Sequence, residues 1–105
     1  MKHGAATPWG RADHVKRIGE INGYAIYQVS TPSHGGDYVP SELLNAIPLA
    51  MQARAAKWSG SAHWYEEDCE WASVAVSFPT LFSPEALNHA QQTIEWRKRE
   101  AGALV

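Results

Sequence analysis

The dipeptide Asn22-Gly23 constrains the fold of this chain more than any other feature of its sequence. Asparagine followed by glycine is a strong signal for a tight β-hairpin turn, because both residues tolerate the positive φ angles of that turn. The segments Asp13–Ile18 and Gly23–Ser30 flank a turn-rich stretch, Gly19–Gly23, and the second segment is rich in β-branched and aromatic residues. The sequence therefore predicts an N-terminal antiparallel hairpin, to which Asp37–Val39 could add a third strand.

Helical spacing replaces this pattern after Ser41. Apolar and long side chains recur there every three or four residues, as on one face of a helix: Leu43, Ile47, Met51, Arg54 and Trp58. Pro48 interrupts the pattern, so we expect a short first turn and a second helix that begins near Pro48.

The two remaining segments differ in clarity. Ser83 is a typical N-cap residue before Pro84, which predicts a terminal helix that Gly102 can end. The segment Trp64–Phe78 fits both a helix and, over its second half, an alternating strand. Its acidic run, Glu66-Glu67-Asp68, suits the positive end of a helix dipole and favours the helix.

These signals together predict one α+β domain over residues 1–105, with an N-terminal antiparallel hairpin or three-stranded sheet packed against two to four helices. The single cysteine, Cys69, excludes an intramolecular disulfide and favours a reducing compartment. No apolar stretch approaches the roughly 20 residues of a membrane helix. We therefore expect a cytoplasmic protein with no membrane contact and no cofactor.

Charge is distributed unevenly along the chain, although the formal net charge is only −2. Residues 1–57 carry a net charge of +2, residues 58–96 carry −6, and residues 97–105 carry +2. The middle block contains no lysine or arginine. Such a block predicts a local acidic field that would suit a basic partner better than a nucleic acid.

Catalytic readings of the sequence are weaker. Cys69 lies among carboxylates, which oppose formation of a reactive thiolate, and Ser33 and His34 are sequence neighbours whose side chains point apart in extended backbone. A metal site could combine His63 and Glu67, four residues apart on a helix, with His34 or Asp37. No known ligand spacing supports that site, and direct nucleic-acid binding by Lys16-Arg17 or Arg97-Lys98-Arg99 rests only on short basic clusters.

The sequence favours protein binding over these other functions, because the segment around Tyr65 combines aromatic and charged side chains, as binding interfaces do. The partner-binding residues predicted from the sequence lie in two segments: Ser33, His34, Tyr65, Glu66, Glu67, Asp68 and Glu70. The alternative hypothesis is a small metal-dependent or hydrolytic enzyme that uses His34 and the Glu66–Cys69 segment.

Three segments carry a resemblance that covers nearly the whole chain: Thr7–Gly10, Ser30–Gly36 and Trp64–Ala72. In order and spacing they resemble an uncharacterised domain family that is encoded on bacterial phages, prophages and conjugative elements. The resemblance implies a role in countering host defence. It leads to the expectation of an anti-CRISPR-like inhibitor whose acidic surface occludes the basic nucleic-acid-binding site of a CRISPR effector or another defence complex.

Overall fold

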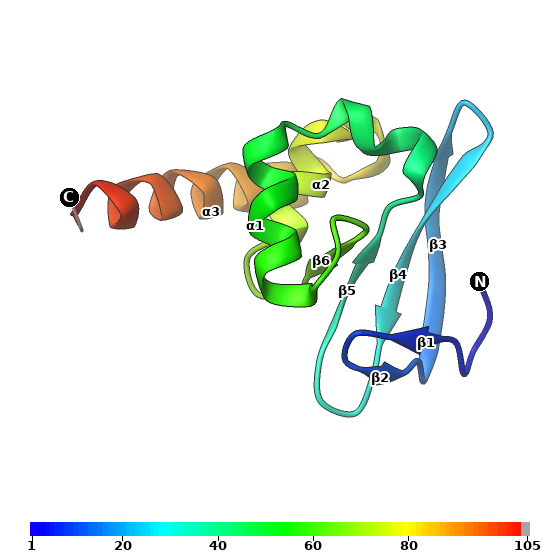
Figure 1. Cartoon of the computed structure of the whole chain (residues 1–105). Coiled ribbons are helices and arrows are strands. Elements are labelled where there is room, and N and C mark those ends of the chain that lie inside the picture. Colours follow the sequence, from blue (N-terminus) through cyan, green and yellow to red (C-terminus); the bar gives the residue numbers. More distant parts are fainter. Residues whose placement is uncertain (104–105) are drawn as a thin grey trace.

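The computed structural model describes residues 1–103 and has four strands in one antiparallel sheet, in the order β3-β4-β5-β6 (Figure 1). The sheet strands are β3 (His14–Ile21), β4 (Tyr24–Ser30), β5 (Gly35–Tyr38) and β6 (Trp64–Glu66). A separate small hairpin consists of β1 (Ala6–Thr7) and β2 (Gly10–Arg11). The helices are α1 (Leu49–Ser59), α2 (Trp71–Ser77) and α3 (Pro84–Ala103), with 3₁₀ turns at Ser41–Ala46 and Pro79–Leu81. The predicted α+β class is confirmed.

The predicted hairpin is present as β3 and β4, joined by the two-residue turn Asn22-Gly23. Both turn residues have positive φ, 52° and 85°, which matches the right-handed twist of the flanking strands. The pairing runs from His14 opposite Ser30 to Ile21 opposite Tyr24, with a bulge between Arg17 and Gly19. The turn signal thus located the hairpin, but β3 continues to Ile21, through three residues that were expected in the turn-rich stretch.

Pro48, Ser83 and Pro84 mark helix boundaries, as the sequence predicted. The first helical stretch ends before Pro48, and α1 begins at Leu49. The Ser83 hydroxyl accepts a hydrogen bond from the Ala86 amide at 3.1 Å, which caps α3. The helix continues to Ala103, so the expectation that Gly102 ends it was wrong.

The segment Trp64–Phe78 is a helix only from Trp71 onward, so the prediction of a helix start at Glu66-Glu67-Asp68 was wrong. Residues 64–66 instead form β6, which pairs with β5 through Gly36 opposite Glu66 and Tyr38 opposite Trp64. A three-residue strand has too little local preference to be seen in sequence, and its pairing with β5 decides its conformation. For the same reason, β5 begins at Gly35, two residues before the expected third strand.

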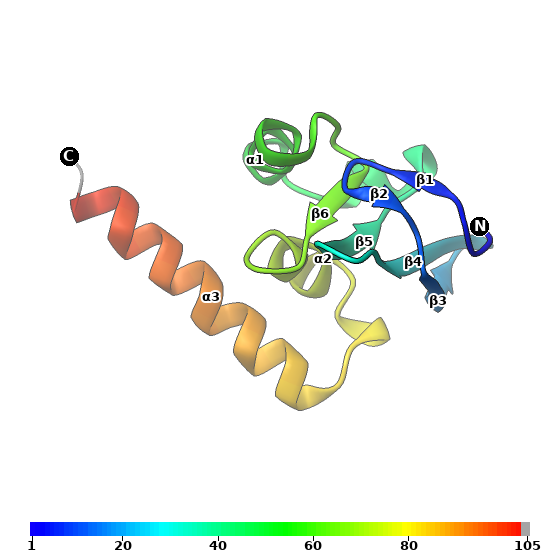
Figure 2. The same ribbon diagram turned by 90° about the horizontal axis from the view of Figure 1, so that it is seen from below.

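The main core lies between the sheet and the helices. Ile26 and Tyr65 of the sheet, with Val39 directly after β5, form this core. They pack with Ala55 of α1, Val74 of α2 and Phe78 at the end of α2. A second cluster joins α2 to α3 through small residues that allow close approach: Ala72, Ala75, Ala90 and Ile94. Figure 2 shows the β1–β2 hairpin and α2 on opposite sides of the sheet, and α3 extending away from it.

Tyr65 is fully buried, yet its phenol oxygen has no hydrogen-bond partner within residues 1–103. Burial raises the pKa of this phenol to about 12. We expect the variant Tyr65→Phe to keep the free energy of unfolding or raise it by about 1 kcal/mol, because it removes a buried polar group that lacks a partner. Urea denaturation measures this. A loss above about 1 kcal/mol would show that the hydroxyl is stabilising.

Helices long and apolar enough to cross a membrane are absent from the part of the chain that the structure describes.

Candidate functional site

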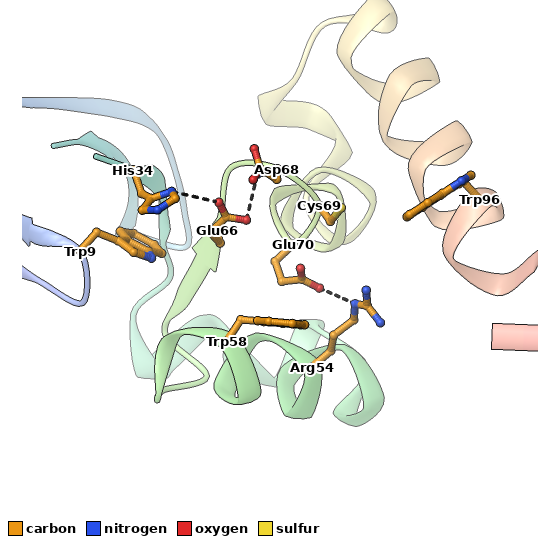
Figure 3. A pocket seen from close by; sticks show the side chains of 9 residues that line it. All are labelled: Trp9, His34, Arg54, Trp58, Glu66, Asp68, Cys69, Glu70 and Trp96. Atoms are coloured by element: carbon orange, nitrogen blue, oxygen red, sulfur yellow. Dashed lines mark hydrogen bonds and ion pairs between the residues drawn. The ribbon is translucent and has the colours of Figure 1, made fainter. Parts of the chain in front are cut away.

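A groove of about 450 Å³ opens between the β1–β2 hairpin, α1 and α3 (Figure 3). It combines three tryptophans with a histidine, an arginine, a cysteine and three carboxylates. Its lining residues are Trp9, His34, Arg54, Trp58, Glu66, Asp68, Cys69, Glu70 and Trp96. Two of the tryptophans are unusually exposed for their size, Trp58 at 63% and Trp96 at 48%.

Trp9 is placed by the small hairpin. The Thr7 hydroxyl donates to the Gly10 carbonyl at 2.7 Å and accepts from the Trp9 amide at 3.1 Å, which closes the turn between β1 and β2. The indole meets Trp64 edge to face, with ring centroids 5.8 Å apart. It also lies against Gly36, where an added Cβ would be 2.6 Å from the indole and would clash with the Tyr65 carbonyl. Only glycine therefore lets Trp9 pack on β5.

His34 comes from a tight turn between β4 and β5. The Thr31 amide donates to the His34 carbonyl at 2.8 Å, and the His34 amide donates to the Thr31 hydroxyl at 3.1 Å. The hydroxyls of Thr31 and Ser33 each lie 3.4 Å from the Trp9 carbonyl, so the turn and the small hairpin support one another. Ser33 thus has a structural contact at the edge of the groove.

Glu66 faces His34 across the groove wall, with 3.8 Å between Oε1 and the His34 Nδ1. Its other oxygen, Oε2, accepts a hydrogen bond from the Asp68 amide at 3.0 Å. Burial raises the pKa of Glu66, since the carboxylate is mostly removed from water. Figure 3 shows His34, Glu66 and Trp9 together on one side of the groove, with Trp96 on the other.

Glu70 forms the floor of the groove and is only 3% exposed. Its Oε1 accepts hydrogen bonds from the Arg54 Nε at 2.6 Å and from the Arg97 Nη1 at 2.8 Å. Arg97 is itself buried, and burial lowers its pKa. One buried carboxylate therefore connects α1 and α3, and its charge is neutralised inside the molecule.

Cys69 is half-buried beside this cluster. Burial raises the pKa of its thiol, and the charge of Glu70 raises it further. A thiol with a raised pKa is a poor nucleophile. This agrees with the argument from sequence against cysteine catalysis.

The two segments singled out in the sequence do meet. The Glu67 amide donates to the Gly35 carbonyl at 3.0 Å, and His34 approaches Glu66. The predicted partner-binding residues nevertheless point in different directions. Ser33, His34, Glu66 and Asp68 lie at or beside the groove, whereas Tyr65 is in the core.

The acidic residues do not form one continuous negative face, so this part of the prediction needs correction. Glu66 is the last residue of β6 and lines the groove, whereas Glu67, the next residue, lines a second cavity on the other face of the sheet. Glu70 is paired internally with two arginines. Tyr65 and Glu70 therefore cannot touch a partner from their observed positions.

Sequence reasoning missed the aromatic and basic members of the groove: Trp9, Trp58, Trp96 and Arg54. The helical spacing grouped Trp58 with the apolar residues of one helix face, but its side chain is largely exposed and lines the groove. Five tryptophans in 105 residues were the one available signal, since so small a core cannot bury all of them.

A metal centre finds no support in the described residues, where no three His, Cys, Asp or Glu side chains gather closely enough to hold an ion. The proposed helical pair of His63 and Glu67 was wrong, because β6 separates them. His63 instead places its Nδ1 2.8 Å from the Val39 carbonyl and stacks on Tyr38.

Residues 2–102 match a family model described as Domain of unknown function (DUF7007). The comparison with curated proteins and the comparison with solved structures give no match.

Proposed function

We propose, from the premise that this chain belongs to the DUF7007 family, that it is a protein-binding module without catalysis whose tryptophan-lined groove takes a basic side chain of its partner. The observation that carries this proposal is the exposure of Trp58 and Trp96 on two different helices around one groove. Exposed tryptophans that share a concave surface are typical anchors of binding interfaces.

The charge of the groove indicates which side chain would fit. Glu66 and Asp68 line it, and within residues 1–103 neither forms an ion pair with a lysine or arginine. Arg54, which also lines the groove, is already held by Glu70. Indole faces and these two carboxylates together attract a guanidinium or ammonium group, through cation–π contact and charge-assisted hydrogen bonds.

The resemblance to domains of mobile elements suggests the partner. Complexes that defend bacteria against phages bind nucleic acid through basic surfaces, and a module that captures an arginine or lysine of such a surface would occlude it. We therefore propose inhibition of a host defence complex, with a CRISPR effector as the leading candidate. In this form the mechanism rests on the groove and on two carboxylates rather than on a broad acidic face.

Removal of either exposed tryptophan should weaken binding strongly. We expect Trp58→Ala or Trp96→Ala to reduce the affinity for a purified effector by about 30-fold, the effect of losing an interface hot spot of about 2 kcal/mol. Calorimetry measures the affinity, and a mobility-shift assay measures whether the effector still binds its nucleic acid.

Leu49→Ala is the matched control, because Leu49 is 81% exposed on the same helix as Trp58 but lies outside the groove. It should leave binding unchanged. The affinities for a hexa-arginine peptide and a hexa-glutamate peptide, measured at equal ionic strength, distinguish a preference for positive charge from nonspecific binding. Equal affinity for both peptides, or unchanged effector binding by both tryptophan variants, would refute the proposal. A charge-reversal variant of Glu70 would not test binding, because Glu70 is buried and paired with two arginines, so the change would affect folding.

A further inference from the structure

We infer that a second cavity, on the other face of the sheet from the groove, binds a small organic cation, an alkylammonium or guanidinium group, through the buried carboxyl of Asp37. This cavity has a volume of about 360 Å³ and lies between the sheet and the start of α3. Its lining includes Gln28, Asp37, Glu67, Trp71, Phe82 and His89.

Asp37 is the strongest feature of this site. It lies in the middle of β5, opposite Gln28 on β4 and Tyr65 on β6, and is only 3% exposed. Its carboxyl forms no hydrogen bond or ion pair with any residue of the described chain, which is unusual for a buried acidic group. Burial raises its pKa from 3.8 to about 7. A bound cation would supply the missing partner.

Glu67 brings a second carboxylate to the same face of the sheet. It directly follows β6, and its amide donates to the Gly35 carbonyl; its Oε2 lies 2.9 Å from the position that a Cβ on Gly35 would take. Gly35 and Asp37 share one face of β5, being two residues apart. Glycine at position 35 therefore makes room for a carboxylate beside the buried one.

Aromatic side chains form the apolar part of the cavity. Trp71 lies against Phe82, with 6.5 Å between ring centroids, and against His89, with 5.4 Å between ring centroids. The stem of an alkylammonium or alkylguanidinium could lie along these rings while its charged end reaches Asp37. The aromatic lining suits an organic cation, and among the described residues no three His, Cys, Asp or Glu side chains lie close enough to hold a metal ion.

Other charged groups around Asp37 are few. His89 of α3 lies at the cavity, and Lys16 of β3 lies on the same sheet face, opposite Gln28. Neither forms an ion pair with Asp37. With a pKa of about 7, Asp37 is ionised at pH 8 and protonated at pH 5, so a cation should bind more tightly at pH 8.

Titration with 1,4-diaminobutane and with butylguanidine at pH 8 tests the inference, against NaCl and MgCl₂ at equal ionic strength. We expect saturable binding by calorimetry that Asp37→Asn weakens at least tenfold and Glu67→Gln weakens about threefold. The variant Glu42→Gln is the matched control, because Glu42 is an exposed carboxylate that lines neither cavity, and it should bind normally. A capped peptide with a single lysine distinguishes a free amine from a partner's side chain.

A second readout does not depend on any variant. Near pH 7 a bound cation should lower the pKa of Asp37, so the wild-type protein should release a fraction of a proton on binding. Calorimetry in buffers of different ionisation enthalpy measures this release. Binding no better than that of the salt controls, or equal binding and proton release in Asp37→Asn, would overturn the inference. Both outcomes are independent of the Trp58 and Trp96 variants, which test the groove.

Discussion

The variant Glu70→Met is expected to lose about 3–5 kcal/mol of the free energy of unfolding, the cost of leaving a buried cation without its partner. Glu70 is the one acceptor shared by Arg54 and Arg97, and Arg97 is buried in the interface between α2 and α3. Domains of this size are stabilised by about 5–15 kcal/mol, so the loss would bring the protein close to unfolding at 37 °C. Urea denaturation measures the change.

The double variant Glu70→Met with Arg97→Met separates charge from packing. It removes the buried cation together with its partner, so we expect it to recover most of the stability lost in Glu70→Met. Arg97→Met alone should cost less than Glu70→Met, because Glu70 keeps its bond to Arg54. Glu67→Ala, at an exposed carboxylate, should stay within about 0.5 kcal/mol of the wild type. A loss below about 1 kcal/mol in Glu70→Met would contradict the assigned role.

The second large effect concerns Asp37 and depends on pH. Its pKa is about 7 in the folded protein against 3.8 for an ordinary aspartate, so the folded state holds this proton more tightly than the unfolded state does. The contribution of protonated Asp37 to the free energy of unfolding is therefore fully present below about pH 4 and is lost as the pH rises through about 7. A shift of this size corresponds to roughly 4 kcal/mol.

Asp37→Asn removes this titration and keeps the shape of the side chain. We expect the variant and the wild type to have similar free energies of unfolding at pH 4, and the variant to be more stable by roughly 4 kcal/mol at pH 8. Urea denaturation at four pH values measures the difference. Asp13→Asn, at an exposed aspartate, should show no such divergence. Parallel stability curves for Asp37→Asn and the wild type would show that burial does not perturb this carboxyl.

Much of the fold could be predicted because its signals are local. The turn at Asn22-Gly23 requires positive φ angles that few other dipeptides tolerate, and both angles are observed. Pro48 cannot continue a helix, and Ser83 satisfies an amide at the start of α3. Each of these effects acts over a few residues, so the same chemistry is present in the unfolded chain.

The candidate site could be predicted only in part, since its residues depend on contacts between distant segments. Glu66, Glu67 and Glu70 are nearly identical in sequence context, yet one lines the groove, one lines the second cavity and one is buried. Pairing of β6 with β5 decides which sheet face each of the first two takes. Arg97, 27 residues further along the chain, decides that Glu70 is neutralised.

Local conformational preference thus specified where the hairpin turns and where the helices begin, because those choices depend on backbone angles and on groups within one turn. The direction and the effective charge of each acidic side chain came from the packed molecule alone. Burial and ion pairing act through three-dimensional distance, and a count of charges along a chain contains no such distance.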